Sequence, residues 1–149
     1  MKYCLTFIGL LILFTGCNKS SSEDQILSDQ LLSLGNDFIM EVDRVAESPD
    51  VQFPMDELDE TDYTSFSGEK NYSVHFTDNG QSVTIEPGSI GGEKIVAESE
   101  ILSYDLTEGL FAGGRFVVWT ENGNFEAELT IYGSGIPIIS SERGKLLPQ

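Results

Sequence analysis

The residues of this sequence that could carry out chemistry are mainly carboxylates. The 149 residues include 25 Asp and Glu but only one histidine, His75, and two cysteines, Cys4 and Cys17. His75 falls on the polar face of an alternating segment, and no second histidine or cysteine stands close enough in sequence to share a metal ion with it. The Gly-x-Ser-x-Gly motif that positions a serine nucleophile does not occur. We therefore predict no catalytic residue, no metal site and no cofactor.

A pair of carboxylates lies on one face of a predicted strand. Glu126 and Glu128 are two residues apart in a segment of strand-like alternation, so both side chains point the same way. Acid–base catalysis needs two such groups in different environments, and so acidic a chain places pairs by chance. The same face carries Val117, Trp119 and Tyr132. We predict an aromatic patch rimmed by carboxylates that binds a partner or ligand, unless the helix or another strand covers it.

A dense acidic run, 56–62, resembles a calcium loop only superficially. An EF-hand loop supplies oxygen ligands from positions 1, 3 and 5 and needs a glycine at position 6. Here position 3 is Leu58 and position 6 is Thr61, so the motif fails. We interpret the run as a solvated acidic loop, with a looser cation site as the alternative.

The charge balance restricts the partners of this protein. The 25 acidic side chains oppose 8 Lys and Arg, which gives a formal net charge of −17. Such a surface repels nucleic acid phosphates and anionic lipid headgroups. We therefore predict no nucleic acid partner. The simpler interpretation is that the negative charge keeps the protein soluble. The alternative is that it binds cations or a cationic partner.

The first residues have the order of an export signal. The cation Lys2 precedes an apolar run from Leu5 to Phe14, and the small residues Thr15 and Gly16 lead into Cys17. A charged start, a short apolar region and a small-residue cleavage site together indicate a signal peptide. The apolar run is about half of the ~20 residues that a membrane-spanning helix needs.

This segment resembles the type II signal peptides of bacterial lipoproteins. The resemblance implies cleavage after residues 1–16 and attachment of diacylglycerol to the Cys17 thiol, so that the membrane is a partner through the lipid anchor. Asn18 and Lys19, with no Asp after the cysteine, further imply the outer membrane of a Gram-negative bacterium. Residues 17–23 would form the lipidated cysteine and a polar tether.

From Asp24 to about Ala46 the apolar residues recur at helical spacing. The stripe predicts one amphipathic helix and consists of Leu27, Leu31, Leu34, Phe38, Val42 and Val45. The Gly35-Asn36 pair is a weak point that could split the helix in two. We expect the stripe to pack on a sheet, the alternative being a partner-binding or membrane-surface helix.

Two Asn-Gly pairs predict β-hairpins. Counting outward from Asn79-Gly80 places Phe76 opposite Val83 and Val74 opposite Ile85. The same count from Asn122-Gly123 places Val118 opposite Ala127, Phe116 opposite Leu129, Trp119 opposite Glu126, and Val117 opposite Glu128. In each hairpin the apolar residues of both strands then share one face, which fixes the register.

The order of these elements predicts an α+β domain, in which an N-terminal amphipathic helix packs on a mostly antiparallel, curved β-sheet. A small β-barrel or sandwich with a helical cap is the alternative. We assign a single domain to 24–144 and a frayed tail to 145–149. The expected function is that of a membrane-anchored envelope lipoprotein with a non-catalytic acidic domain that binds an unknown protein or small molecule. A purely structural envelope protein and a carboxylate-based envelope hydrolase are the alternatives.

Overall fold

The computed structural model describes residues 24–47, 58, 60–95, 100–109, 113–133 and 136–149. The elements in chain order are α1 (Asp24–Ser33), β1 (Asp37–Glu47), η1 (Glu60–Asp62), β2 (Thr64–Ser65), β3 (Asn71–Thr77), η2 (Asp78–Gly80), β4 (Ser82–Glu86), β5 (Ile90–Ile95), β6 (Ile101–Glu108), β7 (Gly113–Glu121), β8 (Asn124–Gly133) and β9 (Ile136–Pro148). The predicted signal peptide and tether, 1–23, and residues 56, 57 and 59 of the acidic run lie outside the described residues.

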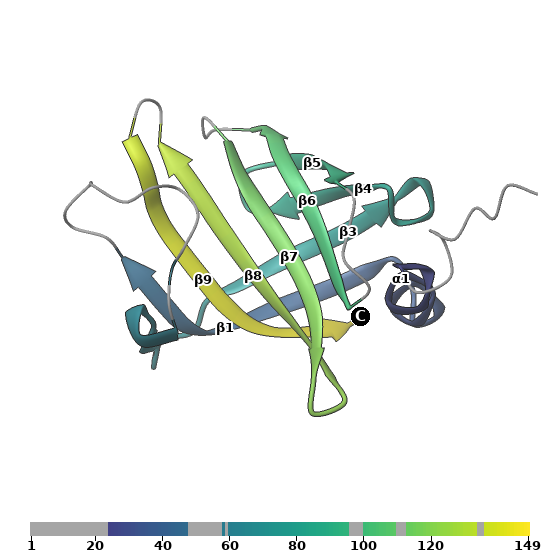
Figure 1. Ribbon diagram of the computed structural model, residues 1–149, viewed down its shortest axis with the longest axis horizontal. Coiled ribbons are helices and arrows are strands. Elements are labelled where there is room, and N and C mark those ends of the chain that lie inside the picture. Colours follow the sequence, from purple (N-terminus) through teal and green to yellow (C-terminus); the bar gives the residue numbers. More distant parts are fainter. Residues whose placement is uncertain (1–23, 48–57, 59, 96–99, 110–112, 134–135) are drawn as a thin grey trace, which may run out of the picture.

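Strands β1 and β3 to β9 form a closed, eight-stranded antiparallel barrel, and β2 adds a short strand at the edge of β1. Neighbouring strands pair in sequence order, and β9 returns to pair with β1 (Figure 1). The predicted alternative, a small barrel with a helical cap, fits this architecture. The main prediction of an α+β sheet is right only in part, because the strands are antiparallel but the sheet closes on itself.

The predicted helix Asp24–Ala46 is wrong in its second half. The helix α1 ends at Ser33, and Gly35 adopts a φ of 130°, a conformation that favours glycine. Strand β1 follows and pairs with β3 and β9. Phe38 and Val42 misled the prediction because a spacing of four places two residues on one face of a helix and also on one face of a strand.

Both predicted hairpin registers are confirmed. Val74 pairs with Ile85 in the first hairpin, and Val118 pairs with Ala127 in the second. In the second hairpin Asn122 and Gly123 have φ of 51° and 80°, as a two-residue turn with both φ positive requires. The inward-facing residues of these strands are therefore those that the alternation predicted.

Aromatic side chains fill much of the barrel interior. Phe38, Phe76, Tyr104 and Phe116 are at most 1 % exposed. The rings of Phe38 and Phe76 meet edge to face with centroids 5.6 Å apart, and those of Tyr104 and Phe116 lie 6.3 Å apart. The Tyr104 hydroxyl donates a 2.8 Å hydrogen bond to the carbonyl oxygen of Gly80, so its buried polar end has a partner.

Helix α1 covers one end of the barrel. It packs against β6 and η2, and Figure 1 shows it beside the end at which residue 149 lies. Leu27 and Leu31 are 5 % and 1 % exposed and join the barrel core, as the stripe predicted. Leu34 follows the helix and is half exposed. The helix is therefore a short cap on an otherwise β structure.

The predicted frayed tail, 145–149, is wrong. Strand β9 continues to Pro148 between β8 and β1, and Leu146 is 1 % exposed opposite Met40. The backbone N–H of Gln149 donates a 2.9 Å hydrogen bond to the carbonyl oxygen of Asp37. The sequence favours a frayed tail because Leu146, the buried residue of this segment, stands among polar residues and close to Gly144.

Gly144 lies where β9 meets β1. A β-bulge interrupts the register of β1 between Val42 and Arg44 at this point. A Cβ atom at position 144 would collide with the carbonyl group of Glu41 and come within 2.9 Å of the Val42 Cα. The absence of a side chain therefore permits the two strands to approach and close the barrel.

Substituting Gly144→Ala should lower the free energy of unfolding by about 3 kcal/mol, because the new methyl group meets rigid backbone rather than a flexible side chain. Urea unfolding followed by far-ultraviolet circular dichroism measures the loss. Ser73→Ala, at an exposed position of β3, is the control and should change stability by less than about 0.5 kcal/mol. Equal stability of the two variants would contradict the role assigned to Gly144.

Candidate functional site

The structure brings the five predicted face residues together on the outer wall of the barrel. Trp119 pairs with Glu126, Val117 pairs with Glu128, and Tyr132 continues the same face of β8. The alternate residues of both strands point inward into the core. The three apolar residues are half-buried, while Glu126 and Glu128 are 8 % and 9 % exposed. Burial of two carboxylates on an outer wall calls for an explanation.

The segment of η1 and β2 explains the burial of Glu128. Glu128 Oε2 accepts a 2.9 Å hydrogen bond from the Tyr63 hydroxyl and a 2.7 Å bond from Arg143 Nε. Its Oε1 accepts a 3.2 Å bond from Thr130 Oγ1. The Tyr63 hydroxyl also lies 2.8 Å from Ser141 Oγ. Glu128 is therefore fully partnered, and it fastens the segment to the barrel wall.

Two arginines complete this fastening, which we call the outer clasp: Tyr63, Glu128, Arg143, Arg44 and Glu60. The Arg143 guanidinium lies over the Tyr63 ring, with its carbon 3.9 Å from the ring centroid. Glu60 bridges the two cations: its Oε1 lies 2.8 Å from Arg44 Nη1, and its Oε2 pairs with Arg143 Nη1. Because Glu60 is exposed, the buried contacts of Glu128 carry more of the stability than the rim pairs.

Glu126 differs from Glu128 because its charge is incompletely paired. Its Oε2 has no hydrogen-bond partner within the described part of the chain, and the nearest cationic atom, Arg44 Nη2, is 4.0 Å away. Burial, with the negative charge of Asp43 as a further cause, raises the pKa of the Glu126 carboxyl. Its cross-strand neighbour is the half-buried Trp119. This corner of the wall thus offers a spare carboxylate oxygen beside an indole.

A third buried carboxylate, Glu142, faces into the barrel. Its cross-strand partners are Leu129 and Val45, which belong to or pack on the core. Lys70 Nζ lies 2.6 Å from Glu142 Oε1 and 5.5 Å from the Tyr72 ring centroid, while Glu142 Oε2 lacks a partner within the described residues. The pair is neutral overall, and a ligand would have to enter the barrel to reach it.

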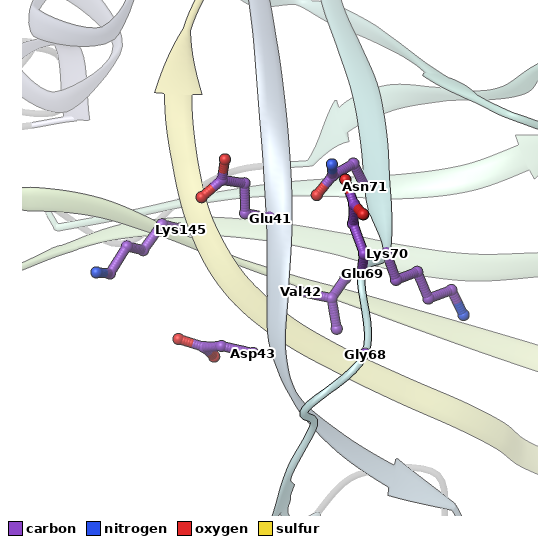
Figure 2. Close-up of a pocket in the computed structure, with 8 residues that line it drawn as sticks. All are labelled: Glu41, Val42, Asp43, Gly68, Glu69, Lys70, Asn71 and Lys145. Carbon is purple, nitrogen blue, oxygen red and sulfur yellow. The ribbon is translucent and has the colours of Figure 1, made fainter.

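An open groove of about 350 Å³ runs along the outer side of β1 and is shown in Figure 2. Its lining includes the carboxylates of Glu41, Asp43 and Glu69 together with Lys145. The Lys70 side chain points away from Lys145 in this view, as its pairing with a residue of the barrel interior requires. Mixed charges and the open shape make this groove a weaker candidate for a binding site than the corner at Glu126.

The described residues give no support for metal binding. His75 is exposed on β3, and its Nδ1 lies 2.6 Å from Asp37 Oδ1. Within the described ranges, no three His, Cys, Asp or Glu side chains gather as a metal site would require. The same part of the chain contains no helix long and apolar enough to cross a membrane.

Comparison with family models, with curated proteins and with solved structures finds no match. Sequence reasoning missed Tyr63, Arg143 and Glu142, since each joins partners more than ten residues away. The composition offered one signal for Arg143: with 8 Lys and Arg among 25 Asp and Glu, each cationic side chain is expected to pair with a carboxylate.

The outer clasp makes stability depend on pH in alkaline solution. Burial, with the negative charge of Glu128, raises the pKa of Tyr63 from 10.0 to about 12. Between these values the unfolded chain loses the Tyr63 proton and the folded protein keeps it, so the free energy of unfolding falls as pH rises from 10 to 12. Tyr63→Phe should flatten this fall, measured as the urea midpoint at successive pH values. An unchanged slope in the variant would show that Tyr63 does not titrate differently on folding.

Proposed function

We propose that this protein is a lipid-anchored protein of the bacterial cell envelope whose non-catalytic β-barrel binds a cationic group. The anchor is Cys17, and the binding site is the corner of the outer wall at Glu126 and Trp119. The outer membrane of a Gram-negative bacterium is the location that the residues after Cys17 favour.

The position of α1 supports an anchor at one end of the barrel. Asp24, the first residue of α1, follows Cys17 by seven residues, which span at most about 25 Å when fully extended. Acyl chains on Cys17 would therefore hold the end that α1 covers near the membrane. Two or more chains give a stable anchor, since each buried CH₂ contributes about 0.8 kcal/mol.

Cys17→Ser should abolish labelling by fatty acid and move the protein from the envelope fraction to the soluble fraction, because serine offers no thiol for acylation. The chain provides a matched control in Cys4, which lies within the proposed signal peptide. Cys4→Ser should remain labelled and sediment with membranes. Retention of the Cys17→Ser protein in the membrane fraction would refute the anchor.

The observation that carries the binding function is the spare oxygen of Glu126. A buried carboxylate oxygen without a partner costs free energy, commonly about 1–3 kcal/mol or more for a charged group. A ligand that donates a hydrogen bond to it removes this cost. The oxygen is buried, but it lies in the outer wall, so a partner would reach it by displacing a neighbouring side chain and not by entering the packed interior.

The chemistry of this corner selects a cation. An ammonium or guanidinium group would meet the Glu126 carboxylate and the Trp119 ring, which attract cations by charge and by the ring quadrupole. The Arg143 guanidinium already lies over this ring, with its carbon 5.9 Å from the centroid, which shows that the indole accepts a cation. The net charge of −17 steers cations toward the protein and repels anions. Lysine or arginine side chains of a protein partner, or a small amine, have these properties.

Lysine- and arginine-containing peptides should quench or shift the fluorescence of Trp119, the one tryptophan of the chain. Glu126→Gln should weaken this binding about ten-fold, because it removes the charge and keeps the shape. Glu108→Gln is the matched control: it makes the same change on an exposed residue at the opposite end of the barrel.

The comparison of the two variants separates a built site from general attraction. Equal weakening by Glu126→Gln and Glu108→Gln would mean that only the net charge matters, and would overturn the assignment. Saturable binding that resists both substitutions would place the site elsewhere. Thermal unfolding of each variant must match that of the parent protein for the comparison to stand.

A further inference from the structure

Exposed apolar side chains gather at one end of the barrel. The large hydrophobic residues with the most accessible surface are Ile26 at 54 %, Leu34 at 50 %, Ile95 at 45 %, Ile101 at 40 % and Leu147 at 39 %. We call these five residues the helix-end collar. Single exposed hydrophobic residues are common on protein surfaces, but a common location at one end is a distinct feature.

The topology places every collar residue at the end that α1 covers. Two belong to the helix itself or directly follow it. Ile95 is the last residue of β5, Ile101 is the first of β6, and Leu147 precedes the last residue of β9. Because the strands alternate in direction, these positions and the start of β1 lie at the same end. Among the residues whose exposed fraction is described, a set that excludes 110–112 and 133–139 at the opposite end, no other large hydrophobic side chain has similar exposure.

We propose that the helix-end collar rests against the headgroup region of the lipid bilayer that holds the acyl chains of Cys17. This inference depends on the anchor proposed above. The short connection from Cys17 to Asp24 keeps this end within about 25 Å of the membrane surface. Isoleucine and leucine side chains gain free energy when they leave water for the boundary of headgroups and acyl chains. The barrel then stands end-on.

The charges at the same end define which bilayer fits. Asp29 on α1, Asp37 at the start of β1, Asp78 in η2 and Glu93 near the end of β5 are exposed. These carboxylates are repelled by anionic lipids. A leaflet rich in the zwitterionic lipid phosphatidylethanolamine is therefore the surface that accepts both the apolar and the acidic residues of this end.

Site-specific fluorescence tests the contact. Once the signal peptide is removed and Cys17 is acylated, a cysteine introduced elsewhere is the one free thiol. Ile26→Cys and, as the control, Thr107→Cys at the opposite end are each labelled with the environment-sensitive fluorophore NBD. Both positions are exposed, so folding should be preserved, and the thermal unfolding of each protein checks this. The full acylated proteins are reconstituted into vesicles of phosphatidylethanolamine and phosphatidylcholine, with and without nitroxide-labelled lipid.

The label at position 26 should emit at shorter wavelength and be quenched by nitroxide at least about two-fold more than the label at 107. Leu34→Cys provides a second collar position and should behave like Ile26→Cys. Labels at 26 and 107 that are equally exposed to water on protein that floats with the vesicles would overturn the collar contact but leave the anchor intact. A blue shift at 26 that follows the surface density of protein, without quenching, would instead assign the collar to contact between copies and overturn the proposal.

Failure of the anchor would give a separate result. A protein that does not float with the vesicles, and that accepts label on Cys17, lacks the acyl chains on which both proposals depend. That outcome refutes the proposed anchor and, with it, the membrane contact of the collar.

Discussion

The pairing of β9 with β1, which we call the seam of the barrel, is the constraint on which the rest of the structure depends. Without it the strands form an open sheet with two unpaired edges, and the aromatic interior faces water on one side. Closure demands a close approach at Gly144, a bulge in β1 opposite it, and a buried Leu146 on the closing strand. A glycine and a bulge at one point of the seam are devices that bend and tighten a sheet.

The outer clasp depends on the same closure. Glu128 belongs to β8, Arg143 to β9 and Arg44 to β1, so the seam is what brings these three charges together. The wall of the barrel therefore gathers several of the few cations of a very acidic chain, where they neutralise carboxylates that would otherwise be buried alone. Glu126, one row away, is left with the incomplete pairing that makes it the candidate for recognition.

The sequence predicted local structure well and closure poorly. Asn122-Gly123 predicts a tight turn, and the alternation then fixes which residues face inward. The registers and the composition of the outer face that carries Trp119 could therefore be predicted without a structure. The structure of the segment around Phe38 could not be predicted in this way, because the spacing of its apolar residues suits both a helix and a strand. Pairing with the distant strands β3 and β9 decides in favour of a strand. Nothing local marks Gly144 as a seam residue or Tyr63 as a partner of Glu128, since these roles arise from contacts across most of the chain.

The closure of the barrel has a kinetic consequence. Phe38 in β1 pairs with Pro148 in β9, so the seam joins residues that are separated by most of the chain. Its formation therefore carries a large loop-closure entropy. A chain that is synthesised from its N-terminus presents β1 early, with one edge that stays unpaired until β9 follows. Folding of such a topology is slow compared with that of helical domains. Until β9 pairs with β1, the incomplete barrel exposes an unpaired strand edge that chaperones and proteases can bind. The rate of closure therefore sets how long the chain is exposed to them.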